Sequence, residues 1–233
     1  GFEHLQEKVH AFRPVAAEES RTSAFTEAYE VGDLLRAQWL YGMGGVDVHA
    51  EHDEAFRWAC WAGYERVARW LHQLGGVDVH AEHDEAFRWA GVAGYESVAR
   101  WLHQLGGVEV HAEDDHAFRC ACEYGHESIA RWLHQLGGVN VHALNDHAFR
   151  WACQNGHERV AGWLHSLGGV DVHAQGDQAF RFACSEGHES LARWLHSLGG
   201  VNTHAANDWA FQVACCNGHE SIARWLHSLG GVD

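Results

Sequence analysis

The chain has 233 residues, with 32 acidic side chains against 16 basic ones, so its formal net charge is −16 at pH 7. This balance argues against nucleic-acid binding, because contacts to phosphates depend on clustered lysine and arginine. No run of 18 apolar residues occurs, so no direct membrane insertion is expected. The 7 cysteines, an odd number, argue against a disulfide framework and favour a reducing, intracellular setting, most naturally the cytoplasm.

The first 21 residues are predicted to form an amphipathic helix and a linker. An apolar stripe from Phe2 to Phe12 falls on one side of a helix that Pro14 would end. Residues 15–21 are small and polar, as in a linker. The helix is expected to cover the start of a repetitive region that begins at residue 22, because the ends of stacked repeats need capping. The chain opens with glycine rather than methionine, so an organelle reached through an upstream targeting segment stays open.

From residue 22 onward a unit of fixed length recurs without insertion. Its leading aspartates succeed one another at intervals of 31 residues: Asp53, Asp84, Asp115, Asp146, Asp177 and Asp208. A fixed period of about 20 to 50 residues predicts a solenoid. Residues 22–233 therefore divide into seven units, the first of them degenerate: 22–52, 53–83, 84–114, 115–145, 146–176, 177–207 and 208–233.

The unit that begins at Asp146 contains two helical patterns. The first has an apolar stripe at spacings of three and four, and Asp146 would cap its helix: Ala148, Phe149, Ala152 and Cys153. Gly156 and His157 end this helix, and a second stripe comes next: Val160, Ala161, Trp163, Leu164 and Leu167. The pair Gly168 and Gly169 ends the second helix, and residues 170–173 form a short extended link.

One helix pair of this size cannot bury its apolar face alone, so the units must stack. The second helices share a tryptophan position, which predicts a buried ladder of indoles: Trp39, Trp70, Trp101, Trp132, Trp163, Trp194 and Trp225. The first helices share a cysteine position, expected to hold small buried hydrophobic side chains: Cys60, Cys122, Cys153, Cys184 and Cys215.

With its helix, Gly-His pair, helix and loop, the unit resembles the ankyrin repeat. Glu54 to Cys60 (Glu-Ala-Phe-Arg-Trp-Ala-Cys) stands where that family carries Thr-Pro-Leu-His-x-Ala-Ala. The family's Gly-His pair recurs as Gly125-His126, Gly156-His157, Gly187-His188 and Gly218-His219. The unit is shorter than the family's usual length of about 33 residues, a form similar to arrays in large DNA viruses and some protists. The resemblance implies an all-α, ankyrin-like solenoid of stacked helix-turn-helix repeats with short connecting fingers.

An arginine replaces the histidine of the ankyrin motif in most units: Arg57, Arg88, Arg119, Arg150 and Arg181. In the family that histidine ties neighbouring loops. The resemblance implies that the arginine takes over this role, by bonding either the aspartate four residues before it or loop carbonyls. The alternative is an ordinary surface pair worth about 0.2–0.5 kcal/mol.

No catalytic motif is present, and we predict neither an enzyme nor a cofactor. The only lysine, Lys8, comes directly after a glutamate, which excludes a Gly-Lys-Ser/Thr phosphate loop. No Gly-x-Ser-x-Gly nucleophile elbow occurs. The nearest approach to a zinc-protease helix runs from His126 to Ala130 and lacks the second histidine.

The 22 histidines fall mainly into three repeat registers. Within a register, neighbours are expected about 10 Å apart, whereas zinc needs nitrogen ligands at about 2 Å. Cys120 and Cys122 beside His116 form the only local cluster, and Cys122 is already assigned to the core, so no metal site is predicted. The link histidines should bond loops, and their titration should loosen the stack below about pH 6: His49, His80, His111, His142, His173 and His204.

The positions that vary between copies mark the surface that the fold leaves free. On the first helix they lie at i, i+4 and i+7, a single stripe opposite the core stripe. From this stripe we select candidate partner-binding residues: Trp58, Trp61, Trp89, Val92, Glu123, Trp151, Gln154, Phe182 and Trp209. The resemblance implies that they line the concave wall, where exposed indoles would anchor a partner. The alternative is that they pack sideways between adjacent first helices.

The sequence thus predicts a non-catalytic protein–protein interaction scaffold that binds a protein partner of unknown identity on its concave first-helix face. A structural subunit, permanently embedded in a larger multiprotein complex, is the alternative. It would bury the N-terminal helix and the apolar face of the last unit, which carries no polar replacements, against neighbouring subunits.

Overall fold

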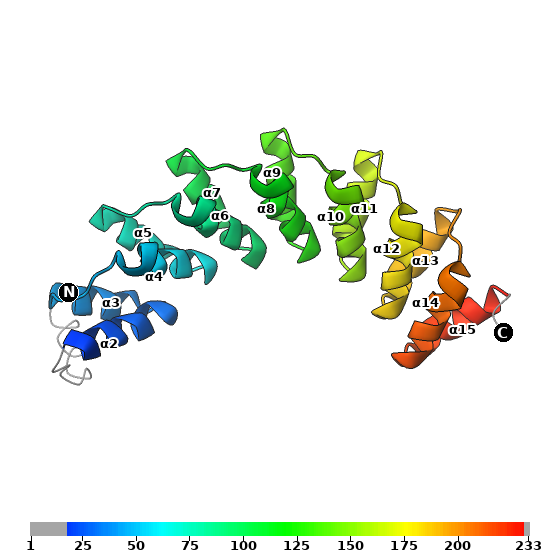
Figure 1. Ribbon diagram of the computed structural model, residues 1–233, viewed down its shortest axis with the longest axis horizontal. Coiled ribbons are helices and arrows are strands. Elements are labelled where there is room, and N and C mark those ends of the chain that lie inside the picture. Colours follow the sequence, from blue (N-terminus) through cyan, green and yellow to red (C-terminus); the bar gives the residue numbers. More distant parts are fainter. Residues whose placement is uncertain (1–17, 231–233) are drawn as a thin grey trace.

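The computed structural model describes residues 18–230, which form helices and no strands. Seven helix pairs succeed one another in a curved row, with α2 at one end and α15 at the other (Figure 1). The first helices of the pairs are α2 (Glu18–Glu30), α4 (Ala50–Trp61), α6 (Ala81–Ala93), α8 (Ala112–Glu123), α10 (Ala143–Gln154), α12 (Ala174–Ser185) and α14 (Ala205–Cys216). The second helices are α3 (Leu34–Gly42), α5 (Glu65–Leu74), α7 (Glu96–Leu105), α9 (Glu127–Leu136), α11 (Glu158–Leu167), α13 (Glu189–Ser197) and α15 (Glu220–Ser228).

The N-terminal end differs from the sequence prediction. Residues 18–21, expected in a linker, are the first turn of α2 instead. The helix can start this early because no glycine or proline occurs between residues 18 and 30 to stop it. The amphipathic helix expected before Pro14 lies outside the described residues.

In the unit that begins at Asp146, both predicted core stripes are buried except at Leu167. In the fifth pair, Phe149 and Leu164 are both 1% exposed and the small side chains beside them are fully covered. Leu167, expected on the buried stripe of α11, is 37% exposed because it is the last residue of that helix, beyond the cover of its neighbours. The glycines that were expected to end the two helices, Gly156 and Gly168, both have positive φ, +75° and +85°.

The helices form two rows. Each first helix packs on the first helix of the next pair, as α4 does on α6 and α6 on α8, while each second helix packs mainly on its own partner. The first helices therefore make a continuous wall, and the second helices approach one another less closely.

The tryptophan ladder is confirmed in the middle of the array. Trp132 is 6% exposed, and its ring packs edge-on against Phe87 and His103 of the preceding pair, with centroids 6.3 and 5.6 Å apart. The guanidinium carbon of Arg100 lies 4.7 Å from the centroid of the Trp132 ring. Three side chains from one pair thus hold the indole of the next, which explains why the pairs stack.

The ladder is less well buried elsewhere, where the prediction was too general: Trp39, Trp70, Trp194 and Trp225 remain partly exposed. For Trp194 the cause is local. Gly162 occupies the α11 position that is arginine in the neighbouring units, so no guanidinium covers the ring. Cys215 was also expected in the core and is exposed, because no further pair covers α14 within the described residues.

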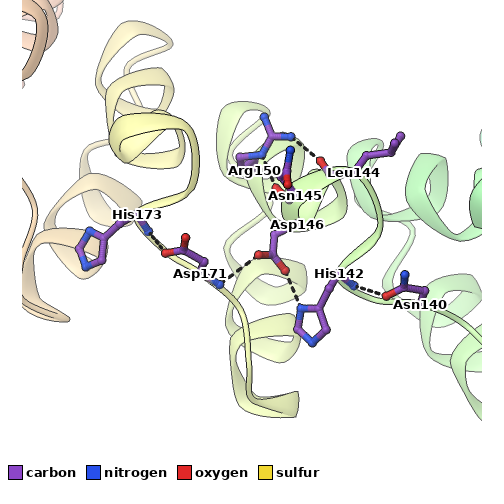
Figure 2. Close-up of polar contacts among 8 residues, drawn as sticks. All are labelled: Asn140, His142, Leu144, Asn145, Asp146, Arg150, Asp171 and His173. Carbon is purple, nitrogen blue, oxygen red and sulfur yellow. Dashed lines mark hydrogen bonds and ion pairs between the residues drawn. The ribbon is translucent and has the colours of Figure 1, made fainter.

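The repeated aspartate does not cap the first helix as predicted. In α10 the residues Leu144, Asn145 and Asp146 have φ between +54° and +57°, a left-handed turn, so regular helix begins only after the aspartate. The carboxylate is 5% exposed and accepts two hydrogen bonds (Figure 2). One comes from Nδ1 of His142 at 2.6 Å, and the other from the backbone N–H of Asp171 in the next unit at 3.1 Å. The aspartate therefore joins two successive links.

The arginine of the motif supports this left-handed turn. Arg150 Nε donates to the carbonyl of Asn145 and a terminal nitrogen donates to that of Leu144, both at 2.8 Å (Figure 2). Left-handed backbone costs a residue other than glycine about 1–2 kcal/mol, and these bonds offset part of that cost. Of the two roles expected for the arginine, bonding to loop carbonyls is the one observed. The same contacts recur at Arg57, Arg119 and Arg181.

The link histidines bond loops, as predicted. The backbone N–H of His173 donates to the carboxylate of Asp171 at 2.9 Å, and His142 makes the equivalent bond to Asn140 (Figure 2). The rings of five link histidines, from His49 to His173, also lie against a glycine of the next unit. A Cβ on Gly169, for example, would be 3.0 Å from Nε2 of His142.

Candidate functional site

The row of first helices exposes indoles at its N-terminal end. Trp61 at the end of α4 is 40% exposed and Trp89 on α6 is 43% exposed, whereas Trp58 is half-buried and packs partly on the core. The rings of Trp58 and Trp61 contact each other, with centroids 4.7 Å apart and planes inclined by 52°. The indole N–H of Trp58 points toward the carbonyl of Glu30 in α2, at 3.5 Å. Trp58 and Trp61 lie three residues apart on α4, and Trp89 occupies the position of Trp58 one repeat later on α6. The packing of α4 on α6 therefore brings the three rings together.

These three tryptophans line one groove between α4 and α6. Its volume is about 320 Å³, and three charged side chains complete the lining: Glu54, Arg57 and Glu85. This volume is at the lower end of the range of about 300–1,000 Å³ found for ligand pockets. The groove therefore fits one large side chain of a partner. We call it the indole groove.

The charged side chains of the indole groove differ in whether they form an ion pair. Arg57 forms an ion pair with Glu85 across the repeat boundary and donates to the carbonyls of Glu51 and His52. Burial acts to raise the pKa of Glu85, but hydrogen bonds from Arg57 and Trp89 outweigh it and leave the pKa below its ordinary value. Glu54 is exposed and takes part in none of the ion pairs found within residues 18–230. One carboxylate of the groove is thus not neutralised.

The middle of the stripe is more closely packed. Val92, Glu123 and Gln154 are half-buried, and burial raises the pKa of the Glu123 carboxyl against the opposing effect of Arg119. Trp151 is half-buried and its ring lies against His147, with centroids 5.4 Å apart. These residues are spread over α6, α8 and α10, and none of them lines the indole groove.

At the C-terminal end of the stripe the aromatic side chains pack sideways. Phe182 on α12 and Trp209 on α14 lie with centroids 6.2 Å apart, and Arg181 covers the Trp209 ring at 5.4 Å. The alternative considered for the whole stripe, packing between adjacent first helices, therefore describes this pair. The candidate residues as a set remain a prediction; of them, Trp58, Trp61 and Trp89 line one groove, and Phe182 and Trp209 contact each other.

Sequence reasoning left three residues of the indole groove out of the candidate set. Glu54 and Glu85 occupy the first position of the same varying stripe, so this signal could have found them. Arg57 occupies a position that the repeat keeps constant, and only the cross-repeat ion pair reveals its place in the groove.

A larger groove of about 870 Å³ lies at the N-terminal ends of α9 and α11, lined by polar groups such as His126, His157 and Arg159. An equivalent groove lies one unit later, with His188 and Arg193 in its lining. Because the lining repeats with the unit, this groove is a feature of the scaffold.

The clustered cysteines lie in different surroundings. Cys122 is fully buried in the core, whereas Cys120 lies on the stripe with its sulfur 3.5 Å from Nε2 of His116. Burial raises the pKa of Cys120 to about 11. Within residues 18–230, no three or more histidine, cysteine or acidic side chains are grouped as metal ligands would be. None of the described helices combines the length and apolarity needed to cross a bilayer.

Stacked helical hairpins in a continuous row define this molecule as an all-α solenoid. A family model described as ankyrin repeats in three copies matches residues 149–233, and a second ankyrin repeat model matches residues 118–165. The crystal structure of the human ASB11 ankyrin repeat domain has a similar fold, with a TM-score of 0.63 and 22% sequence identity. The match covers 89% of this chain and 97% of that domain.

A search of curated proteins found no match. Residues 118–233 therefore match the ankyrin repeat family, and the described chain as a whole has the fold of an ankyrin repeat solenoid. Ankyrin repeats generally mediate protein–protein interaction. The structural likeness, at its low sequence identity, extends to the fold alone.

Proposed function

We propose that the chain is a non-catalytic scaffold that binds a protein partner on the face formed by its first helices. The observation that carries the proposal is the pair of exposed indoles, Trp61 and Trp89, beside half-buried Trp58 in one groove. Large apolar side chains gathered on a surface mark interaction sites, and tryptophan is prominent among the residues that dominate binding energy. The indole groove is therefore the proposed anchor point for the partner.

Outside the indole groove, the shifted pKa values of histidines and cysteines support a structural role for these side chains. Burial lowers the pKa of His116, His147 and His157, and burial also raises the pKa of the core thiols. These shifts arise from packing within the scaffold. All the described cysteines are free, which suits a reducing intracellular compartment.

The test is capture of the partner by the wild type and by a double variant, Trp61→Ser with Trp89→Ser. Affinity purification from the native source, read by mass spectrometry, should lose the partner with the double variant. The unfolding temperature should stay unchanged, because both side chains are exposed. Trp58 is kept because it also packs on the core. Tyr124→Ser, which removes an exposed ring outside the groove, is the matched control. Capture of the same proteins by the double variant would refute the proposal.

A structural subunit of a larger complex is the second candidate. The last helix pair leaves an open groove of about 310 Å³ whose lining includes Phe211, Cys215 and Ala223, the side that the next pair covers in interior units. Size-exclusion chromatography separates the two functions. A scaffold should elute as a stable monomer, whereas an embedded subunit should be found only with its complex.

A further inference from the structure

The indole groove combines aromatic faces with surplus negative charge. We infer that it binds the alkylammonium group of a lysine side chain, unmodified or methylated, on a basic segment of the partner. This inference rests on the proposed function and names the chemistry of the bound segment.

The geometry of the indoles supports a cationic guest. A cation is attracted to the face of an indole when it lies within about 6 Å of the ring centroid. Trp58 and Trp61 form an inclined corner, with planes 52° apart, and Trp89 completes the lining from the next repeat. The polar edges of two indoles are already engaged, since Trp58 faces the carbonyl of Glu30 and Trp89 bonds Glu85. A ligand in the groove would therefore meet the rings rather than these N–H groups.

The charge of the lining selects a cation over a neutral apolar group. The lining contains two carboxylates, Glu54 and Glu85, and one guanidinium, Arg57, so its net charge is −1. The guanidinium is engaged by Glu85 and by two backbone carbonyls, and no other cationic side chain within residues 18–230 pairs with Glu54. The whole chain, at −16, adds a field that draws basic segments toward it.

The groove is particular to one place in the array. One repeat further on, the positions of Trp58 and Trp61 are filled by Trp89 and Val92, and two repeats on by Cys120 and Glu123. The scaffold repeats without needing these indoles. Their clustering beside the Glu54 carboxylate is therefore a property of this site and not of the fold.

The test uses short neutral peptides, acetyl-Ala-Gly-X-Gly-Ala-amide, in which X is lysine, trimethyllysine or norleucine. Titrations of the full chain up to millimolar peptide are monitored by NMR of the tryptophan indole N–H groups. We expect saturable shifts at Trp58, Trp61 and Trp89 with lysine or trimethyllysine, and binding at least about 5-fold weaker with norleucine. Whichever of the two cations binds more tightly identifies the methylation state of the natural segment.

Two variants sharpen the result. Glu54→Gln should weaken the two cationic peptides and leave norleucine unchanged, whereas Tyr124→Ser should alter nothing. Norleucine binding as tightly as lysine, or the absence of saturable shifts with both cations, would overturn the inference. The proposed function would still stand if the double variant Trp61→Ser with Trp89→Ser loses the partner, so the two failures are distinguishable.

Discussion

At the scale of single residues, glycine has opposite effects on stability at two positions of the array. Gly125 comes after α8 with φ +78°, and a Cβ there would lie 2.5 Å from the ring of His157 in the next unit. Gly162 lies within α11, where a Cβ would meet nothing within 4 Å. The first glycine is required by the turn and by the neighbouring ring, whereas the second only weakens its helix.

Gly162→Arg should therefore stabilise the protein. The change removes a helical glycine, which costs about 1 kcal/mol, and adds a guanidinium that can cover Trp194 as Arg131 covers Trp163. We expect the free energy of unfolding in urea to rise by about 1–2 kcal/mol. Gly125→Ala, the matched change at a required glycine, should lower it. A loss of stability in the Gly162→Arg variant would show that Trp194 is not held as its neighbours are.

The buried aspartate makes a second prediction at this scale. Asp115 accepts from Nδ1 of His111 at 2.6 Å and from the backbone N–H of Asn140 at 2.9 Å. Asp115→Asn retains one acceptor oxygen but places an amide N–H₂ where the other accepts, so we expect a loss of about 2 kcal/mol. Urea unfolding measures it. Asp114→Asn, an exposed neighbour on the same turn, should change stability by less than about 0.5 kcal/mol, and equal effects of the two would contradict the proposed link.

The residue scale is also where sequence prediction failed most clearly. The pattern suggested an aspartate cap, because aspartate before an apolar helical stripe is the usual signal. The left-handed turn at Leu144 to Asp146 contains no glycine, so its conformation has no local signature. It is held by a distant link and by Arg150, contacts that only the folded chain shows.

At the scale of helices, the spacing of apolar residues predicted most of the buried positions correctly. The spacing of Phe149 and Leu164 placed both in the core, and the Gly-His pairs marked the turns. Failures lie at helix ends and at the end of the array. Leu167 is the last residue of α11, where neighbouring helices do not cover it, and Cys215 lies on α14, which no further pair covers within the described residues. Periodicity identifies a face but not what covers it.

The buried ladder gives a prediction at the helix scale. Trp132→Ala should cost about 3–5 kcal/mol, because it removes a buried ring packed on Phe87, His103 and Arg100. Trp194→Ala, at the same position but partly exposed and without the arginine, should cost clearly less. Urea denaturation with both variants provides the comparison. A loss below about 1 kcal/mol for Trp132→Ala would contradict the stacking described for the central pairs.

At the scale of the whole molecule, the histidines make stability depend on pH. Burial, assisted by Arg119, Arg150 and His116, lowers the pKa of His147 to about 4, and burial also lowers the pKa of His157. The unfolded chain thus binds more protons than the native one between about pH 6.5 and pH 4. Stability from these groups is complete above about pH 6.5 and is lost as the pH falls through that window.

The free energy of unfolding should accordingly fall by about 1–2 kcal/mol between pH 7.5 and pH 5, after allowance for the partial exposure of these rings, and the unfolding midpoint should fall with it. The link histidines hold the buried aspartates, as Nδ1 of His142 does Asp146, and the loosening expected from them stays a prediction. Replacing His147 by glutamine should flatten the pH dependence. A midpoint that is constant between pH 8 and pH 5 would contradict this account.

The position of the candidate site could be predicted only in part. Variation between the copies found the stripe, and helical spacing gives the face on which it lies. Which indoles stay exposed depends on neighbours, since Phe182 and Trp209 pack together while Trp61 and Trp89 do not. That distinction depends on contacts between side chains of successive units.

The most direct test of the central claim, that the partner is held on the first-helix face, is hydroxyl-radical footprinting of the protein alone and of the affinity-purified complex. Trp61 and Trp89 should oxidise readily in the free protein and be protected in the complex, while exposed Tyr124 reacts equally in both. Equal oxidation of the two indoles in both samples, with protection confined to the second helices, would contradict the account.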